Sequence, residues 1–165
     1  MSKPYFAKEL SELPTLQDVV SRSGLQLMQD IVDGDVSGPP IGETMGFWPV
    51  LAEDGKVVFE GKPEFKVLNP IGTVHGGWYG TILDSCMSCA VQTKLRQGQI
   101  YTTLEFKVNI IRPIPLGTTV HAIGTVHHVG RSTGIADGEI KGVEDGKLYA
   151  TGSATCIIMD GPRPE

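Results

Sequence analysis

The stretch NPIGTVHGGWYGTILDSCMSC, residues 69–89, decides how the rest of the sequence is interpreted. It predicts a long helix from about His75 to Arg96, whose apolar residues cover most of the circumference, so the helix should be largely buried. The polar residues recur at steps of three and four and form one narrow stripe, which consists of Thr81, Asp84, Ser85, Ser88 and Gln92. The sequence therefore predicts a buried helix that carries a carboxylate near its middle.

This carboxylate, Asp84, has no lysine or arginine within one helical turn. It lies well beyond the first turn, so it can neither cap the helix nor compensate its dipole. An unpaired carboxylate that is buried destabilises the fold or has its pKa raised. Two interpretations follow. The polar stripe faces solvent or a subunit interface, or it lines a ligand cleft in which Asp84 does chemistry.

The residues at the start of the helix favour the second interpretation. Gly76 and Gly77 follow His75, and free N–H groups at a helix N-terminus can hydrogen-bond an oxyanion when no side chain is in the way. The two glycines could also serve only close packing or a tight turn. Together with Asp84 two helical turns away and the polar loop residue Asn69, they suggest an acyl-transfer site.

After Gly98 the pattern changes to a period of two, which is typical of strands. Four alternating stretches, separated by turn signals at 130–132 and 144–146, predict an antiparallel meander. In the first stretch Leu104, Phe106, Val108 and Ile110 share one face. The other three stretches present small residues on one face, among them Gly124, Gly134, Ala136, Gly138, Ala150, Gly152 and Ala154. Glycine weakens a strand unless another backbone must come close, so we expect a curved antiparallel sheet wrapped around the central helix.

The N-terminal part adds further elements. Residues 1–14 are interpreted as a tail, and residues 15–34 predict one amphipathic helix with Thr15 as its N-cap and Gly34 as its stop. A hairpin is expected at Asp54–Gly55. We therefore expect an α+β protein with one domain over residues 35–165 and an extra N-terminal helix.

Composition excludes several classes of protein. The net charge of -5 argues against a general nucleic-acid binder, and no apolar run reaches the roughly 18–20 residues of a membrane span. The polar N-terminus lacks the core of a signal peptide, so we expect a cytoplasmic protein. Cys86 and Cys89 form a CxxC inside the predicted helix, where small core residues are favoured over a redox or zinc role. His127 and His128 should point to opposite faces of a strand, so we expect no metal.

The run HGGWYGTILD, residues 75–84, resembles the HGG…D signature of hotdog-fold thioesterases. The similarity is to the branch with the phenylacetate-pathway acyl-CoA thioesterases and one type of 4-hydroxybenzoyl-CoA thioesterase. VNIIRPIPLG, VHHVGRSTG and KLYATGSATCII also match that family, so the resemblance covers about residues 44–160. It implies a hotdog fold and dimers joined edge to edge, usually paired into tetramers, with active sites shared between two protomers.

The resemblance also implies roles for individual residues. Asp84 would be the nucleophile or the general base, and the backbone N–H of Gly76 would polarise the thioester carbonyl. His75 would shape the loop rather than carry the proton. Asn69 would lie near the thioester carbonyl or the water, and Ser88 would help to place that water.

We therefore expect an acyl-CoA thioesterase that hydrolyses an aryl- or medium-chain acyl-CoA. Gly77 is a second possible amide donor to the substrate. Because the protein is acidic overall, local cations must hold the phosphates of coenzyme A. Arg131, in the turn with Ser132, is the first candidate and Arg112 is another. Coenzyme A would be part of the substrate, with no separate cofactor. The alternative is a non-catalytic hotdog protein that binds acyl-CoA.

Overall fold

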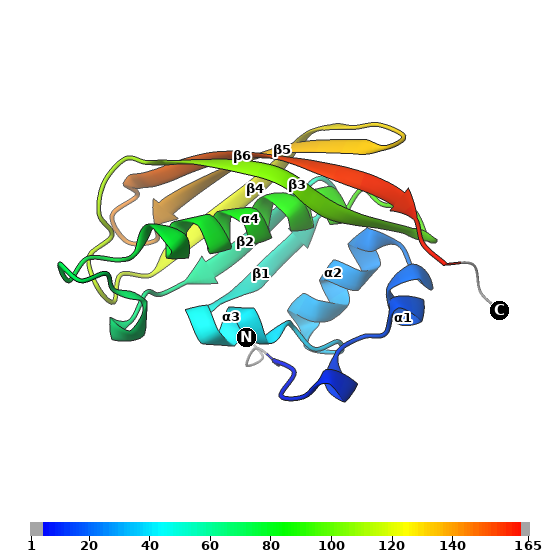
Figure 1. Ribbon diagram of the computed structural model, residues 1–165, viewed down its shortest axis with the longest axis horizontal. Coiled ribbons are helices and arrows are strands. Elements are labelled where there is room, and N and C mark those ends of the chain that lie inside the picture. The colour runs from blue at the N-terminus through cyan, green and yellow to red at the C-terminus, as the bar shows by residue number, and fades with distance from the viewer. Residues whose placement is uncertain (1–4, 163–165) are drawn as a thin grey trace.

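The computed structural model describes residues 5–162, in which six strands form one antiparallel sheet that curves around a central helix (Figure 1). The helix is α4 (Gly76–Gln92). The strands are β1 (Phe47–Glu53), β2 (Lys56–Gly61), β3 (Gln99–Ile110), β4 (Val120–Val129), β5 (Thr133–Gly142) and β6 (Leu148–Asp160). The predicted α+β architecture, a curved antiparallel sheet around a long central helix, is confirmed.

The small residues of the sheet face α4, as the sequence predicted. A Cβ atom added to Gly124 would lie 2.0 Å from the carbonyl oxygen of Cys86, so the strand backbone and the helix backbone are in direct contact. At Gly138 and Gly152 an added Cβ would meet Met87 and Leu83 instead. The glycines therefore let the sheet approach a helix whose own large side chains fill the core.

The predicted four-stranded meander is wrong for its first strand. β4, β5 and β6 are consecutive neighbours, but β3 pairs with β6 and lies at the sheet edge, in the order β1-β2-β4-β5-β6-β3. β4 pairs instead with β2, the second strand of the predicted hairpin at Asp54–Gly55. The reason lies in the connection 111–119, which is long enough to cross the sheet and is interrupted by prolines. Strand alternation alone does not report such a crossover.

The single helix predicted for residues 15–34 is also wrong, because two helices occupy this segment: α1 (Leu16–Val20) and α2 (Gly24–Asp33). Thr15 and Gly34 cap their outer ends as predicted. Between them, the Ser23 side chain caps α2 by accepting from the Gln26 N–H. The N–H of Gly24 donates to the Leu95 carbonyl after α4 rather than to a carbonyl of α1, so a tertiary contact interrupts the helix.

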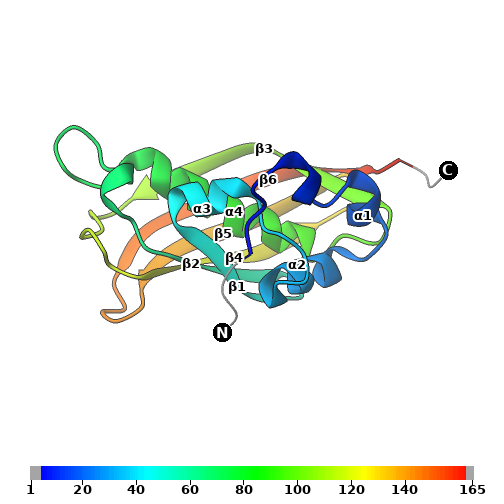
Figure 2. The same ribbon diagram turned by 90° about the horizontal axis from the view of Figure 1, so that it is seen from below.

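The remaining helical elements are short. They are the 3-10 turns η1 (Leu10–Glu12) and η2 (Phe65–Val67) and the helix α3 (Pro40–Met45). Figure 2 shows α1, α2 and α3 together on one side of the molecule, where α2 packs against β1. Residues 5–14, expected to be a tail, lie against this part, since the Ala7 N–H donates to the Gly38 carbonyl at 3.0 Å. Residues 1–4 of the predicted tail are outside the described part of the chain.

α4 is shorter than predicted. It ends at Gln92 rather than Arg96, and His75 precedes it as the N-cap. Among the helices within residues 5–162, none has both the length and the apolarity to cross a membrane.

Candidate active site

The N-terminus of α4 is held by the side chain of His75. The His75 Nδ1 accepts a hydrogen bond of 2.8 Å from the Gly77 N–H, and the Trp78 N–H donates to the His75 carbonyl at 2.9 Å. His75, Gly76 and Gly77 are all exposed. The first turn of the helix therefore has a defined shape and is open to a ligand.

Because His75 caps the helix in this way, the N–H groups of Gly76 and Gly77, which the sequence suggested as equivalent donors, differ in their hydrogen bonding. The Gly77 N–H is occupied by His75, so it is not free to bind a substrate oxygen. The Gly76 N–H donates to no acceptor within residues 5–162. It therefore keeps the unsatisfied donor and the positive end of the helix dipole that an oxyanion needs. The Gly76 N–H is therefore the candidate oxyanion donor. The expectation that the Gly77 N–H is a second donor to the substrate has to be corrected, because this N–H already donates to His75.

Asp84 points from the middle of α4 toward the edge strand β3. It is half-buried, and its Oδ1 accepts a hydrogen bond of 3.0 Å from the Thr103 Oγ1. Burial raises the pKa of Asp84 above its ordinary value, and the Thr103 hydrogen bond offsets part of this rise. A carboxylate that is partly desolvated and oriented by one donor is better suited to take a proton or to attack a carbonyl than a solvated surface carboxylate.

Thr103 is a site residue that the sequence analysis missed. Simple alternation placed it on the face opposite Leu104, Phe106, Val108 and Ile110. In the structure the register shifts between Thr103 and Glu105, and this bulge turns Thr103 toward α4 together with Phe106 and Ile110. Leu104, at the bulge, is 60% exposed. No local sequence pattern marks the bulge, so Thr103 could not be found by periodicity.

The side chain of Asn69 organises its own loop. Its Oδ1 accepts from the N–H groups of Ile71 and Thr73, both at 3.1 Å, and its Nδ2 donates to the Thr73 Oγ1 at 2.7 Å. These bonds shape the segment that leads into His75. The second N–H of the Asn69 amide has no acceptor within residues 5–162, so it is open to a substrate or a water molecule.

The predicted polar stripe does not form one continuous cleft. The hydroxyl groups of Thr81 and Ser85 donate hydrogen bonds to the helix carbonyls four residues earlier. Ser88, predicted to place a water molecule, is buried beside Tyr101. Gln92 is covered by α2, because an added Cβ at Gly24 would lie 1.8 Å from the Gln92 carbonyl oxygen. Asp84 is the one charged residue of the stripe, and it is half-buried beside the edge strand β3.

The three cysteines contribute no ionised sulfur to the site. Cys86, Cys89 and Cys156 are free thiols in or near the core. Burial raises the pKa of each, that of Cys89 to about 12. Within residues 5–162 no three side chains of the His, Cys, Asp or Glu types lie close enough to hold a metal ion.

The candidate residues for coenzyme A lie at opposite ends of α4. Arg112 is exposed, and its carbonyl lies near the hydroxyl of Tyr79 in the first turn of the helix. Arg131 and Ser132 lie in the exposed turn before Gly134, where an added Cβ would meet Val91 in the last turn of α4. A single chain therefore does not bring these residues together.

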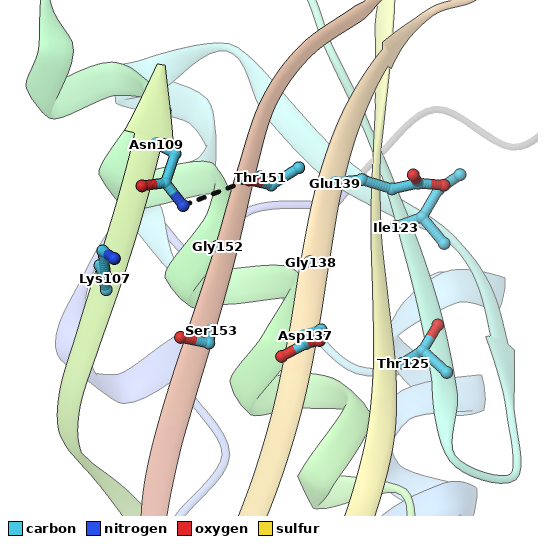
Figure 3. Close-up of a pocket in the computed structure, with 10 residues that line it drawn as sticks. All are labelled: Lys107, Asn109, Ile123, Thr125, Asp137, Gly138, Glu139, Thr151, Gly152 and Ser153. Carbon is cyan, nitrogen blue, oxygen red and sulfur yellow. Dashed lines mark hydrogen bonds between the residues drawn. The ribbon is translucent and has the colours of Figure 1, made fainter. Parts of the chain in front are cut away.

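A groove of about 410 Å³ crosses the sheet on its other face. Figure 3 shows Asp137 and Glu139 on β5 and Ser153 and Thr151 on β6 among the polar residues that line it. Gly138, between the two acidic residues, faces α4, so their side chains point away from the helix. The sheet therefore separates this groove from Asp84.

The fold and the site define a class of protein: a hotdog fold with an open helix N-terminus and a half-buried carboxylate two turns along the same helix. Residues 71–149 match the thioesterase superfamily. These residues therefore form a thioesterase superfamily domain, as the HGG…D signature predicted.

Individual relatives agree with this assignment. A predicted esterase of Caenorhabditis elegans is 30% identical over 112 residues, which are 68% of this chain and 66% of that protein. Human acyl-coenzyme A thioesterase 13 is 29% identical over 64% of this chain and 75% of its own length. The crystal structure of a phenylacetic acid degradation-related thioesterase from Ralstonia eutropha superposes with a TM-score of 0.71 and 27% identity, covering 79% of this chain and 98% of that one.

Proposed function

We propose that this protein is an acyl-CoA thioesterase that hydrolyses an aryl- or medium-chain acyl-CoA to the free acid and coenzyme A. The observation that carries the proposal is Asp84, a half-buried carboxylate that Thr103 orients at the edge of the sheet. Thioester hydrolysis needs such a carboxylate together with a donor for the carbonyl oxygen. The similarity to human acyl-coenzyme A thioesterase 13 and to the Ralstonia eutropha thioesterase also supports the proposal. Coenzyme A is then part of the substrate, with no separate cofactor.

The chemistry divides between two groups. The Gly76 N–H stabilises the negative charge that develops on the thioester oxygen, a type of donor whose loss typically costs about 10²–10³ in rate. Asp84 either takes a proton from the attacking water or attacks the carbonyl carbon itself and forms a mixed anhydride. In both routes the C–S bond breaks, and coenzyme A leaves as the thiolate and takes up a proton. In the general-base route the oxygen of water enters the acid directly. In the nucleophilic route water hydrolyses the anhydride at the Asp84 carbonyl carbon, so the acid leaves with an oxygen of Asp84 in the first turnover. A single turnover in ¹⁸O water that yields unlabelled acid would identify the nucleophilic route.

Two copies of the chain are needed to complete this site. Gly76 and Asp84 are eight residues apart on one helix, which separates them by about 12 Å along its axis. One thioester carbonyl cannot contact both. We infer that the Gly76 N–H of one protomer and the Asp84 carboxylate of another act on the same substrate.

The edge strand β3 supplies a geometry for this pairing. It is 12 residues long, and it exposes Leu104, Phe106 and Ile110 at 60%, 45% and 50%. Long apolar edge strands readily pair with another chain. On β3, Thr103 lies beside Asp84, to which it donates a hydrogen bond. Ile110 lies beside Gly76, because a Cβ added to Gly76 would be 3.6 Å from the Ile110 Cδ1. Antiparallel β3–β3 pairing centred near Phe106 therefore places each Asp84 at the Gly76 end of the other copy.

The same pairing has a consequence for coenzyme A. Arg131 and Ser132 lie beyond the last turn of α4, so the antiparallel arrangement carries them toward the Gly76 end of the second copy. There they would join that copy's Arg112 in binding the phosphates. We propose the homodimer as the catalytic unit, with pairs of dimers forming tetramers in the cytoplasm.

Thiol release from a panel of aryl- and alkyl-CoA esters tests the activity, and size-exclusion chromatography with light scattering tests the assembly. The proposal predicts turnover by the dimer or tetramer only. Phe106→Asp should give monomers that retain the fold but release no thiol. Tight binding of acyl-CoA without turnover would instead identify the alternative, a non-catalytic binding protein.

A further inference from the structure

The hydroxyl of Tyr79 joins the first turn of α4 to the connection between β3 and β4. The Tyr79 Oη accepts a hydrogen bond of 2.8 Å from the Ile114 N–H, and it lies 3.4 Å from the Arg112 carbonyl oxygen, which is a long contact. The phenol is 1% exposed and Ile114 is 2% exposed. The short bond to Ile114 is therefore the one that holds this segment.

The sequence of the segment makes that bond hard to replace. In Arg112-Pro113-Ile114-Pro115 the two prolines have no N–H, and each restricts the residue before it to extended conformations. The Arg112 N–H donates back to the Tyr149 carbonyl at 3.2 Å. Ile114 therefore carries the only backbone donor of the segment that can hold it against α4. Without an acceptor this buried N–H would be left unsatisfied.

The bond also sets where a positive charge lies relative to the candidate site. Tyr79 is three residues after Gly76, so the two residues share one face of the helix. Arg112 is exposed and has no carboxylate within 4 Å among residues 5–162. The segment that Tyr79 holds thus carries, near the end of α4 with the Gly76 N–H, an arginine whose guanidinium has no carboxylate partner among residues 5–162.

We propose that Tyr79 is a positioning residue for substrate binding, which acts by holding Arg112 where the anionic nucleotide of an acyl-CoA is bound. This inference rests on the proposed thioesterase function. The Tyr79 hydroxyl touches no reacting atom, so its loss raises KM and weakens the binding of coenzyme A while kcat stays near the parent value.

The test is the affinity for coenzyme A, measured by calorimetry because it needs no turnover. Tyr79→Phe removes only the hydroxyl, and we expect Kd to rise about threefold to tenfold, the usual worth of one hydrogen bond. Thr93→Val is the matched control. The Thr93 Oγ1 also accepts from a backbone N–H, that of Gly55 at 2.8 Å, but it lies just after the far end of the same helix. This variant should lose stability without a change in Kd.

A second comparison separates positioning from a general loss of stability. In an Arg112→Ala background, Tyr79→Phe should have no further effect on Kd, because the group that it positions is absent. An undiminished effect in that background overturns the proposal, and so does an unchanged Kd in Tyr79→Phe alone. If Tyr79→Phe does not fold, Pro113→Ala, which loosens the segment but keeps the hydroxyl, should raise Kd instead, and a parent-like Kd there also overturns the proposal. A parent protein that binds no coenzyme A refutes the proposed function and this inference together.

Discussion

Replacing Asp84 with Asn separates the stability of this protein from its activity. The carboxylate is half-buried, and burial raises its pKa, so the folded state binds this proton more tightly than the unfolded state does. Protonation of Asp84 therefore stabilises the folded state at low pH, and this stabilisation is lost as the pH rises through the raised pKa of the folded state. At pH 7 the ionised carboxylate destabilises the fold, and a neutral amide of the same shape does not.

The size of this effect follows from the environment of Asp84. Loss of hydration costs a buried polar group about 1–3 kcal/mol in proteins. Asp84 keeps part of its hydration and accepts one hydrogen bond from Thr103, so the lower end applies. We expect Asp84→Asn to gain about 1 kcal/mol at pH 7, which raises Tm by about 2–4 °C in a protein of this size. The gain should vanish below the ordinary pKa of aspartate.

The assay is urea unfolding between pH 3 and pH 8, together with thiol release at pH 7. Asp35→Asn, which removes one exposed charge, corrects for the change in net charge. The same Asp84→Asn protein should lose about 10²–10⁴ in kcat, the usual contribution of a general base, while it still binds coenzyme A. A variant less stable than the parent at pH 7 would refute the reasoning on burial. Hydrolysis at the parent rate would refute the role of Asp84.

Three further substitutions test the contacts around the site. Thr103→Val removes the donor to Asp84, so the acidic limb of the pH–rate profile should move to higher pH, whereas Thr103→Ser should leave it in place. Gly76→Ala has room for its methyl group, so circular dichroism should show a native fold while kcat/KM falls by about tenfold, because the methyl hinders approach to the N–H. Gly124→Ala would place a Cβ 2.0 Å from the Cys86 carbonyl oxygen. Since neither backbone can yield, it should cost about 3 kcal/mol or more in urea unfolding, and parent-like stability would contradict the close helix–sheet contact.

Features that depend on a few neighbouring residues could be predicted from the sequence. The apolar circumference of residues 76–92 predicted a buried helix, and the glycines on three strands predicted the sheet that packs against it, because each pattern reports one surface of one element. The Asp54–Gly55 hairpin and the caps at Thr15 and Gly34 are equally local. Asp84 stood out for the same reason, since it interrupts an apolar run without a local partner.

Only the tertiary structure decided which elements meet. The contact between Gly24 and the end of α4 breaks the N-terminal helix, and the crossover after β3 makes that strand an edge. The bulge beside Thr103 turns its hydroxyl toward Asp84. The His75 ring accepts from the Gly77 N–H, whereas the Gly76 N–H meets no acceptor in the part of the chain that the structure describes. Periodicity describes how one segment divides its residues between two faces. It carries no information about long-range partners, and in this protein those partners determine which donors and which strand edge remain available to a substrate.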